Sequence, residues 1–117
     1  MRVSVYYNLH KHCLSLRSMQ GASYGRVIAH RNAVWLKDVK FVVNESGRQR
    51  VIKEKRKNVH AFVRGTITDD IIGLGLKEVI VTYNPYKYDS FVIKDTERLI
   101  KEAEFVKISD KIITAYV

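Results

Sequence analysis

Two histidines and several cations of this sequence are the residue types that metal-free cleavage of RNA requires. Histidine as a residue type changes its charge near neutral pH, so one ring of the pair His30 and His60 can act as a general base and the other as a general acid. Arg50, Lys55 or Arg64 can supply the positive charge that stabilises a phosphate in the transition state. The sequence therefore contains the parts of a metal-independent ribonuclease. We rank this enzyme below a binding function, because four histidines in a basic chain produce such a set easily.

A dense basic run leads directly into a stretch with the alternation of a β-strand, KEKRKNVHAFVRG at residues 53–65. Successive side chains of a strand point to opposite faces, so Val59, Ala61 and Val63 are expected in the core. The other face then carries a polar, aromatic and basic set: Asn58, His60, Phe62 and Arg64. Another interpretation stays open, in which Phe62 packs under a neighbouring strand and His60 is a half-buried histidine with its hydrogen bonds satisfied.

Such a strand face suits nucleic acid, because phosphates bind lysine and arginine while bases stack on aromatic rings. We predict that the strand presents the specific contacts and that the preceding run gathers the phosphate backbone. The predicted cations of the run are Arg48, Arg50, Lys53, Lys55, Arg56 and Lys57. Two further strands carry similar faces: residues 2–8 present Arg2, Ser4, Tyr6 and Asn8 on one side, and His30 shares a side with Arg26 and Ile28. If these strands are neighbours, one sheet face becomes polar, aromatic and basic.

A second cluster of aromatic residues surrounds the turn that Asn84 and Pro85 open, in the stretch VTYNPYKYDSFV at residues 81–92. The candidates for ligand contact here are Tyr83, Tyr86 and Lys87, since this loop can clamp a base if it lies near the strand at 58–64. The alternative is a corner packed for stability, which is the commoner role of such clusters.

Apolar residues recur mostly with period two, and turn signals separate them every 8–12 residues or so. This pattern predicts a mainly β domain over residues 1–117, built as a small antiparallel barrel or sandwich of short strands with one or two short helices. Helical turns are expected in residues 68–78 and 95–106. Residues 79–83 are expected to form a central strand and residues 111–117 the last strand. The basic run at 48–57 is interpreted as a flexible connection or an edge strand.

The net charge of +9 is spread unevenly along the chain. Residues 1–65 hold 14 lysines and arginines against 3 acids, whereas residues 66–117 hold 7 against 9. A field of this sign attracts nucleic acid, nucleotides or another polyanion such as an acidic protein. The alternative is a solvated basic surface that serves solubility alone. The oligomeric state stays open, and a homodimer is compatible with the sequence.

Other motifs predict little. No phosphate-binding or dinucleotide-binding glycine motif indicates a cofactor, and His10 and His12, which a strand would point the same way, are not followed by further metal ligands at suitable spacing. Cys13 is interpreted as an ordinary strand residue. The sequence shows neither a secretory signal nor a membrane-spanning run, so we expect the protein in the cytoplasm.

Three stretches resemble a family of small proteins of tailed phages and prophages: YYNLHKHCLSL at residues 6–16, GRQRVIKEKRKNVHAFVRG at 47–65 and YNPYKYDSFV at 83–92. The resemblance implies a phage origin and an accessory gene, many of which block host defences. It adds the hypothesis of an inhibitor that binds a host defence protein, its guide RNA or a signalling nucleotide. It carries no site residue over to this sequence.

Overall fold

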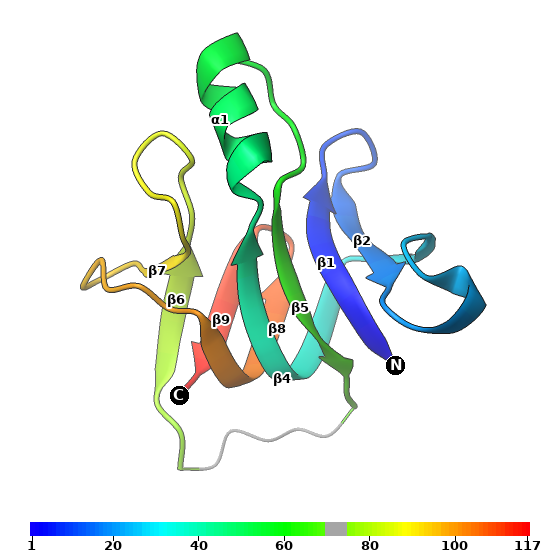
Figure 1. Ribbon diagram of the computed structural model, residues 1–117. Coiled ribbons are helices and arrows are strands. Elements are labelled where there is room, and N and C mark those ends of the chain that lie inside the picture. Colours follow the sequence, from blue (N-terminus) through cyan, green and yellow to red (C-terminus); the bar gives the residue numbers. More distant parts are fainter. Residues whose placement is uncertain (70–74) are drawn as a thin grey trace.

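The computed structural model describes residues 1–69 and 75–117, and within these ranges nine antiparallel strands form one sheet (Figure 1). The spatial order is β3-β2-β1-β5-β4-β8-β9-β6-β7. The strands are β1 (Arg2–Asn8), β2 (Cys13–Ser18), β3 (Val27–Arg31), β4 (Ala33–Val43), β5 (Ala61–Ile67), β6 (Glu78–Thr82), β7 (Val92–Ile93), β8 (Glu102–Ser109) and β9 (Ile112–Tyr116). A short 3₁₀ turn, Gly21–Ser23, follows β2. The predicted mainly β class is confirmed.

The period-two pattern places the core on one side of this sheet. Val3 and Val5 of β1 are fully buried, and their cross-strand neighbours Val63 and Leu16 are buried as well. Buried residues of β6, β8 and β9 belong to the same cluster, so both halves of the sheet enclose one core. At about 25 cal/mol per Å² of apolar surface removed from water, this shared core is the main stabilising contribution to the fold.

The sheet bends in the middle of β4. Asp38 has a positive φ of 51°, and the pairing of β4 with β5 shifts between Lys37 and Lys40. An aspartate tolerates this left-handed conformation better than a branched residue does. In Figure 1 the cyan first half and the teal second half of β4 run in different directions as a result. We call the side of the sheet opposite the core the outer side.

Gly65 allows β5 to approach β4 closely next to this bend. A Cβ atom at residue 65 would lie 3.0 Å from the Leu36 Cβ atom and 3.1 Å from the Lys37 carbonyl oxygen. These contacts are tighter than most real Cβ contacts, so the close approach requires glycine.

The helix α1 (Glu45–Glu54) stands beyond the ends of β4 and β5, beside the loop that follows β6 (Figure 1). Asn44 caps it: the Oδ1 atom accepts a hydrogen bond of 3.0 Å from the Gly47 amide. Glu45 in the first turn and Lys53 in the last complement the helix dipole, and Lys55 ends the helix in a left-handed conformation. The prediction of a flexible connection or edge strand at 48–57 is therefore wrong, because local capping favours a helix.

Other predicted elements need correction. Residues 95–106 form no helix, since Glu97 has a positive φ of 57° and residues 102–106 already belong to β8. The strand predicted at 79–83 forms as β6, but it lies next to the end of the sheet rather than at its centre.

The helical turns expected at 68–78 fall partly on residues 70–74, which lie outside the described residues, and the flanking residues 68–69 and 75–77 are not helical. His10 and His12 occupy the turn between β1 and β2 rather than a strand, whereas Cys13 begins β2 as expected. Within the described ranges, no helix combines the length and the apolar character that a membrane span needs.

Candidate nucleic-acid interface

Three cations lie in one row across four strands on the outer side of the sheet. Arg17 of β2 pairs with Ser4 of β1, Ser4 pairs with Arg64 of β5, and Arg64 pairs with Lys40 of β4. Paired residues of antiparallel strands point to the same face, and neighbouring strands are about 4.8 Å apart. The three positive charges therefore start from backbone positions within about 14 Å of each other. We call this set the cation row.

An aromatic row lies beside the cation row, two residues further along the same strands. Tyr6 of β1 contacts Phe62 of β5 edge to face, with ring centroids 6.0 Å apart and planes at 85°. Ser15 pairs with Tyr6 on one side and with His30 of β3 on the other, and the His30 Nδ1 atom lies 3.1 Å from the Ser15 hydroxyl. Residues two apart along a strand are about 7 Å apart. The aromatic row thus consists of the rings of Tyr6, Phe62 and His30. Together with the cation row it forms what we call the outer patch.

Arginine side chains join the two rows. The Arg17 guanidinium lies 5.0 Å from the centroid of the Tyr6 ring and 5.8 Å from that of Phe62, which is cation–π distance. The Arg64 Nε atom is buried and has no hydrogen-bond partner in the part of the chain that the structure describes. Buried polar atoms are nearly always bonded in folded proteins, so this unpaired donor is an exception within the described residues.

The structure confirms that β1 and β5 place Tyr6, Phe62 and Arg64 on one face, but it removes His60 from that face. β5 begins at Ala61, and the His60 side chain is only 7% exposed. Its Nδ1 atom donates to the Asn58 carbonyl at 2.7 Å, and its Nε2 atom lies 2.7 Å from the Tyr83 hydroxyl.

The helix fixes this position of His60. A Cβ atom at Gly47 would lie 2.7 Å from the His60 Cβ atom, so the first turn of α1 sits directly on the histidine. Asn58, which was expected beside it on the strand, is exposed in the segment before β5. The strand therefore begins at Ala61, three residues later than the sequence pattern indicates.

The two histidines of the hypothetical ribonuclease are not brought together. His30 lies on β3, and β2 and β1 separate β3 from β5, which makes three strand spacings or about 14 Å. Direct proton transfer needs heavy atoms about 3 Å from the reacting group. The geometry therefore gives no support to acid–base catalysis by this pair.

The other predicted binding residues gather at one end of the sheet, which we call the helix end: α1, the segment 55–59 and the loop 83–91. Its exposed cations are Arg50, Lys53, Lys55, Arg56 and Lys57. Arg48 has a different role: its Nε atom donates to the Pro85 carbonyl at 3.0 Å and the Tyr88 carbonyl at 2.9 Å. It also pairs with Glu45 at 2.8 Å. Arg48 thus attaches α1 to the loop and is not a free cation.

The aromatic loop is partly a packed corner and partly exposed. Tyr83 stacks on Phe91 with centroids 5.1 Å apart, and burial raises the pKa of Tyr83 to about 12, although the nearby Arg48 opposes this shift. Tyr86 is 61% exposed. Lys87 pairs with Glu97 at 2.6 Å, and Tyr88 also donates to that carboxylate. These bonds hold the pKa of Glu97 below its usual value. Of the three predicted contacts in the loop, Tyr86 is the most available to a ligand.

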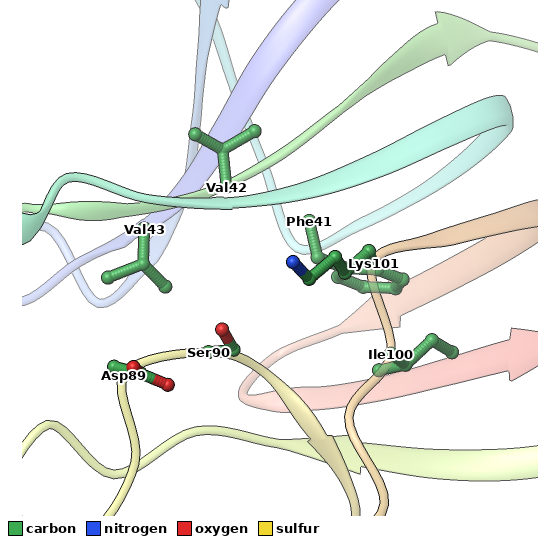
Figure 2. A pocket seen from close by; sticks show the side chains of 7 residues that line it. All are labelled: Phe41, Val42, Val43, Asp89, Ser90, Ile100 and Lys101. Carbon is green, nitrogen blue, oxygen red and sulfur yellow. The ribbon is translucent and has the colours of Figure 1, made fainter.

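A hollow of about 250 Å³ opens between the end of β4 and the loop 83–91 (Figure 2). Its lining consists of Phe41, Val42, Val43, Asp89, Ser90, Ile100 and Lys101. Small-molecule sites usually measure about 300–1,000 Å³. The hollow is smaller, and Asp89 offsets the charge of Lys101, so it gives little support to the capture of a signalling nucleotide.

A wider depression of about 470 Å³ lies at the bend of the sheet. Three acids line it, Asp38, Glu102 and Glu104, together with Lys40 and the apolar residues Val39, Leu76, Ala103 and Val117. An anionic ligand is disfavoured there by the local charge.

Sequence reasoning missed Arg17 and Lys40, which complete the cation row. The alternation of Cys13, Ser15 and Arg17 in β2 carries a usable signal for the first. Lys40 is harder to place, because the irregular pairing at Asp38 interrupts the alternation of β4. The helix was missed although Asn44, Glu45 and the basic last turn form a typical start and stop signal.

Comparisons with known proteins agree with the resemblance to phage proteins. A family model described as Mycobacterium phage L5 gene 82 protein matches residues 1–116. The gene 82 protein of Mycobacterium phage L5 is 36% identical over 124 residues, an alignment that covers 98% of this chain and 95% of that protein. No solved structure matches the chain.

Proposed function

Because the chain belongs to the family of the Mycobacterium phage L5 gene 82 protein, we propose for it a function that serves a phage: it binds single-stranded nucleic acid, RNA or DNA, at the outer patch. The observation that carries this proposal is the cation row lying beside the aromatic row. Phosphates of a strand contact Arg17 and Arg64, while bases about 7 Å away stack on Tyr6 and Phe62. Lys40 contributes less, because its cross-strand neighbour on β8 is Glu102.

The aromatic rings of the outer patch support this function because the fold does not need them as core. Tyr6 and Phe62 do not belong to the core cluster of the described residues or to the side chains packed against it. Both rings are half-buried on the outer side, as expected for rings that rest on a sheet and keep an accessible edge or face. A single strand can present unpaired bases to such a surface, whereas the bases of a duplex are stacked on each other.

The helix end contributes a second, less specific attraction. The helix α1 lies beyond the ends of β4 and β5 (Figure 1), and the exposed cations of the helix end raise the local concentration of a polyanion near the outer patch. We expect this contribution to weaken with salt, because each phosphate contact releases counterions. Stacking on Tyr6 and Phe62 is much less sensitive to salt.

The test measures, by fluorescence anisotropy across a salt series, how tightly the protein binds labelled single-stranded and double-stranded RNA and DNA. We expect single strands to bind more tightly than duplexes, with affinity falling steadily as salt rises. Phe62→Ala removes a stacking ring, which contributes about 1–3 kcal/mol per base, so affinity falls at every salt concentration. Arg64→Gln lowers the salt slope by about 0.7.

The matched control is Tyr24→Ala, since Tyr24 is 63% exposed, lies in the turn region after β2 and belongs to neither row. Thermal unfolding of each variant checks that the fold is retained. Equal affinities of the Phe62→Ala and Tyr24→Ala variants, or binding that does not respond to salt, contradict the proposal.

We also propose that this binding counters a host defence that acts on nucleic acid. Expression of the protein in bacteria that carry such a defence should raise the plating efficiency of a sensitive phage, and the Phe62→Ala variant should not. Equal protection by both proteins would separate the biological role from the outer patch.

A further inference from the structure

Trp35 lies in a second group of aromatic and basic side chains on the outer side of the sheet, beyond the bend in β4. Its ring stacks on Tyr116 of β9 with centroids 5.7 Å apart and planes at 27°, and the Lys107 Nζ atom lies 5.5 Å from the Trp35 centroid. Trp35 pairs with Lys107 of β8, while Lys37 pairs with Phe105, which pairs in turn with Tyr116. We call these five residues the tryptophan patch.

Like the rings of the outer patch, the three rings of the tryptophan patch are not part of the core. Trp35, Phe105 and Tyr116 are half-buried, and none of them belongs to the core cluster of the described residues or to its packed neighbours. The core-facing neighbours in the same strands are Leu36, Val106 and Ala115, which are fully buried. Strand alternation thus keeps the rings on the outer side, with a cation above the Trp35 ring.

The outer patch and the tryptophan patch are continuous through β5 and β4. Phe62, Arg64 and Thr66 alternate along the outer side of β5, and Thr66 pairs with Lys37 across the bend. From β2 to β9 the path crosses six neighbouring strands, which is five spacings or about 24 Å. This length exceeds what one or two nucleotides can span and lies within the range of single-strand sites, about 4–16 nucleotides per small β domain.

We propose that the tryptophan patch is a second stacking platform and that one nucleic-acid strand runs from the outer patch along Arg64 and Thr66 of β5 to Lys37 and Trp35, beside the acidic depression rather than through it. This inference rests on the proposed function and adds the path of the strand. Lys37 and Lys107 contact phosphates, and Trp35 and Phe105 receive bases. Glu78 pairs with Tyr116 from the far side, and its negative charge marks the end of the path.

The experiment uses Trp35 as its own probe, because it is the single tryptophan of the chain. Oligothymidylates of about 2 and about 12 nucleotides, of which only the longer one can span the path of about 24 Å, are titrated into the full-length protein. Tryptophan emission is recorded beside the anisotropy of a labelled copy of each oligonucleotide. We expect the longer oligonucleotide to quench Trp35 emission in step with the anisotropy change.

Two variants separate stacking from structure. Trp35→Ala should weaken binding of the longer oligonucleotide by about tenfold, which is 1.4 kcal/mol and within the range for one stacked base, and should change the affinity of the shorter one much less. Trp35→Phe keeps an aromatic plane, so it should restore most of the affinity while removing the emission signal. Tyr24→Ala is the control and should bind both oligonucleotides as the unchanged protein does.

The outcomes distinguish this inference from the proposed function. If anisotropy shows salt-dependent binding and Trp35 emission does not change, or if Trp35→Ala binds the longer oligonucleotide normally, the strand does not reach the tryptophan patch and only this inference is overturned. If anisotropy shows no binding of either oligonucleotide, the proposed function fails and the inference fails with it.

Discussion

The outer patch and the helix end are both basic, but they hold their cations in different ways. In the outer patch, Arg17, Arg64 and Lys40 start from paired positions of a continuous sheet, and the Arg17 guanidinium rests against aromatic rings. At the helix end, Arg48 ties α1 to a loop, whereas cations such as Arg56 are exposed to solvent. Charge density alone therefore does not define a binding site. The helix end attracts a polyanion, whereas the outer patch can also orient one.

The largest effect is expected from breaking the attachment of the helix end. Arg48→Ala removes the donor that binds the Pro85 and Tyr88 carbonyls, and hydrogen bonds to charged groups contribute about 1.5–3 kcal/mol. We expect the free energy of unfolding to fall by about that amount. Hydrogen exchange should show faster exchange of amides in α1 and unchanged exchange in β1 and β5.

Arg50→Ala is the matched control, since Arg50 lies on the same helix and is exposed. Exposed substitutions usually change stability by less than about 0.5 kcal/mol. Equal loss of stability in the two variants would mean that the contacts of Arg48 do not hold the helix end in place.

The next effect concerns affinity and separates attraction from orientation. Replacing Lys53, Arg56 and Lys57 together by glutamine should weaken binding of a single strand by about tenfold at low salt and lower the salt slope by about 0.7 for each cation that contacts a phosphate. The control replaces Lys77, Lys94 and Lys101, which are exposed outside both regions, and changes the net charge equally.

If the two triple variants lose affinity equally, net charge rather than the position of the helix end controls the attraction. If the variant with Lys53, Arg56 and Lys57 replaced still prefers single strands to duplexes, the outer patch alone accounts for that preference.

The smallest effect concerns the buried interior of the helix end. Burial raises the pKa of Tyr83 to about 12, above the ordinary value of about 10, so folding favours the neutral phenol. The corresponding contribution to stability is complete below pH 10 or so and is lost as the pH rises through the folded pKa. The tyrosinate absorbance of the unchanged protein and of the Tyr83→Phe variant is measured as the pH is raised. The difference between the two curves, which reports Tyr83 alone, should rise with a midpoint near pH 12. A midpoint near pH 10 would show that Tyr83 is open to solvent.

Local patterns predicted much of this structure. The period-two alternation gave the mainly β class, the core residues such as Val3 and Val63, and the shared side of Tyr6 and Arg2, because strand geometry depends only on neighbouring residues. The pattern was misleading where a tertiary contact replaced it: the alternation of residues 58–64 placed His60 beside Phe62, but the first turn of α1 and Tyr83 enclose the histidine instead.

Residue types and their spacing are enough to predict which residues alternate, where the positive charge is concentrated and that a polyanion is the expected partner. Which strands become neighbours depends on the folded arrangement of the whole chain. The pairing of β1 with β2 and β5 aligned Arg17, Ser4 and Arg64 from positions far apart in the chain, and the bend at Asp38 connected them to Trp35. Strand register depends on packing and backbone hydrogen bonds between distant segments, which no local pattern contains.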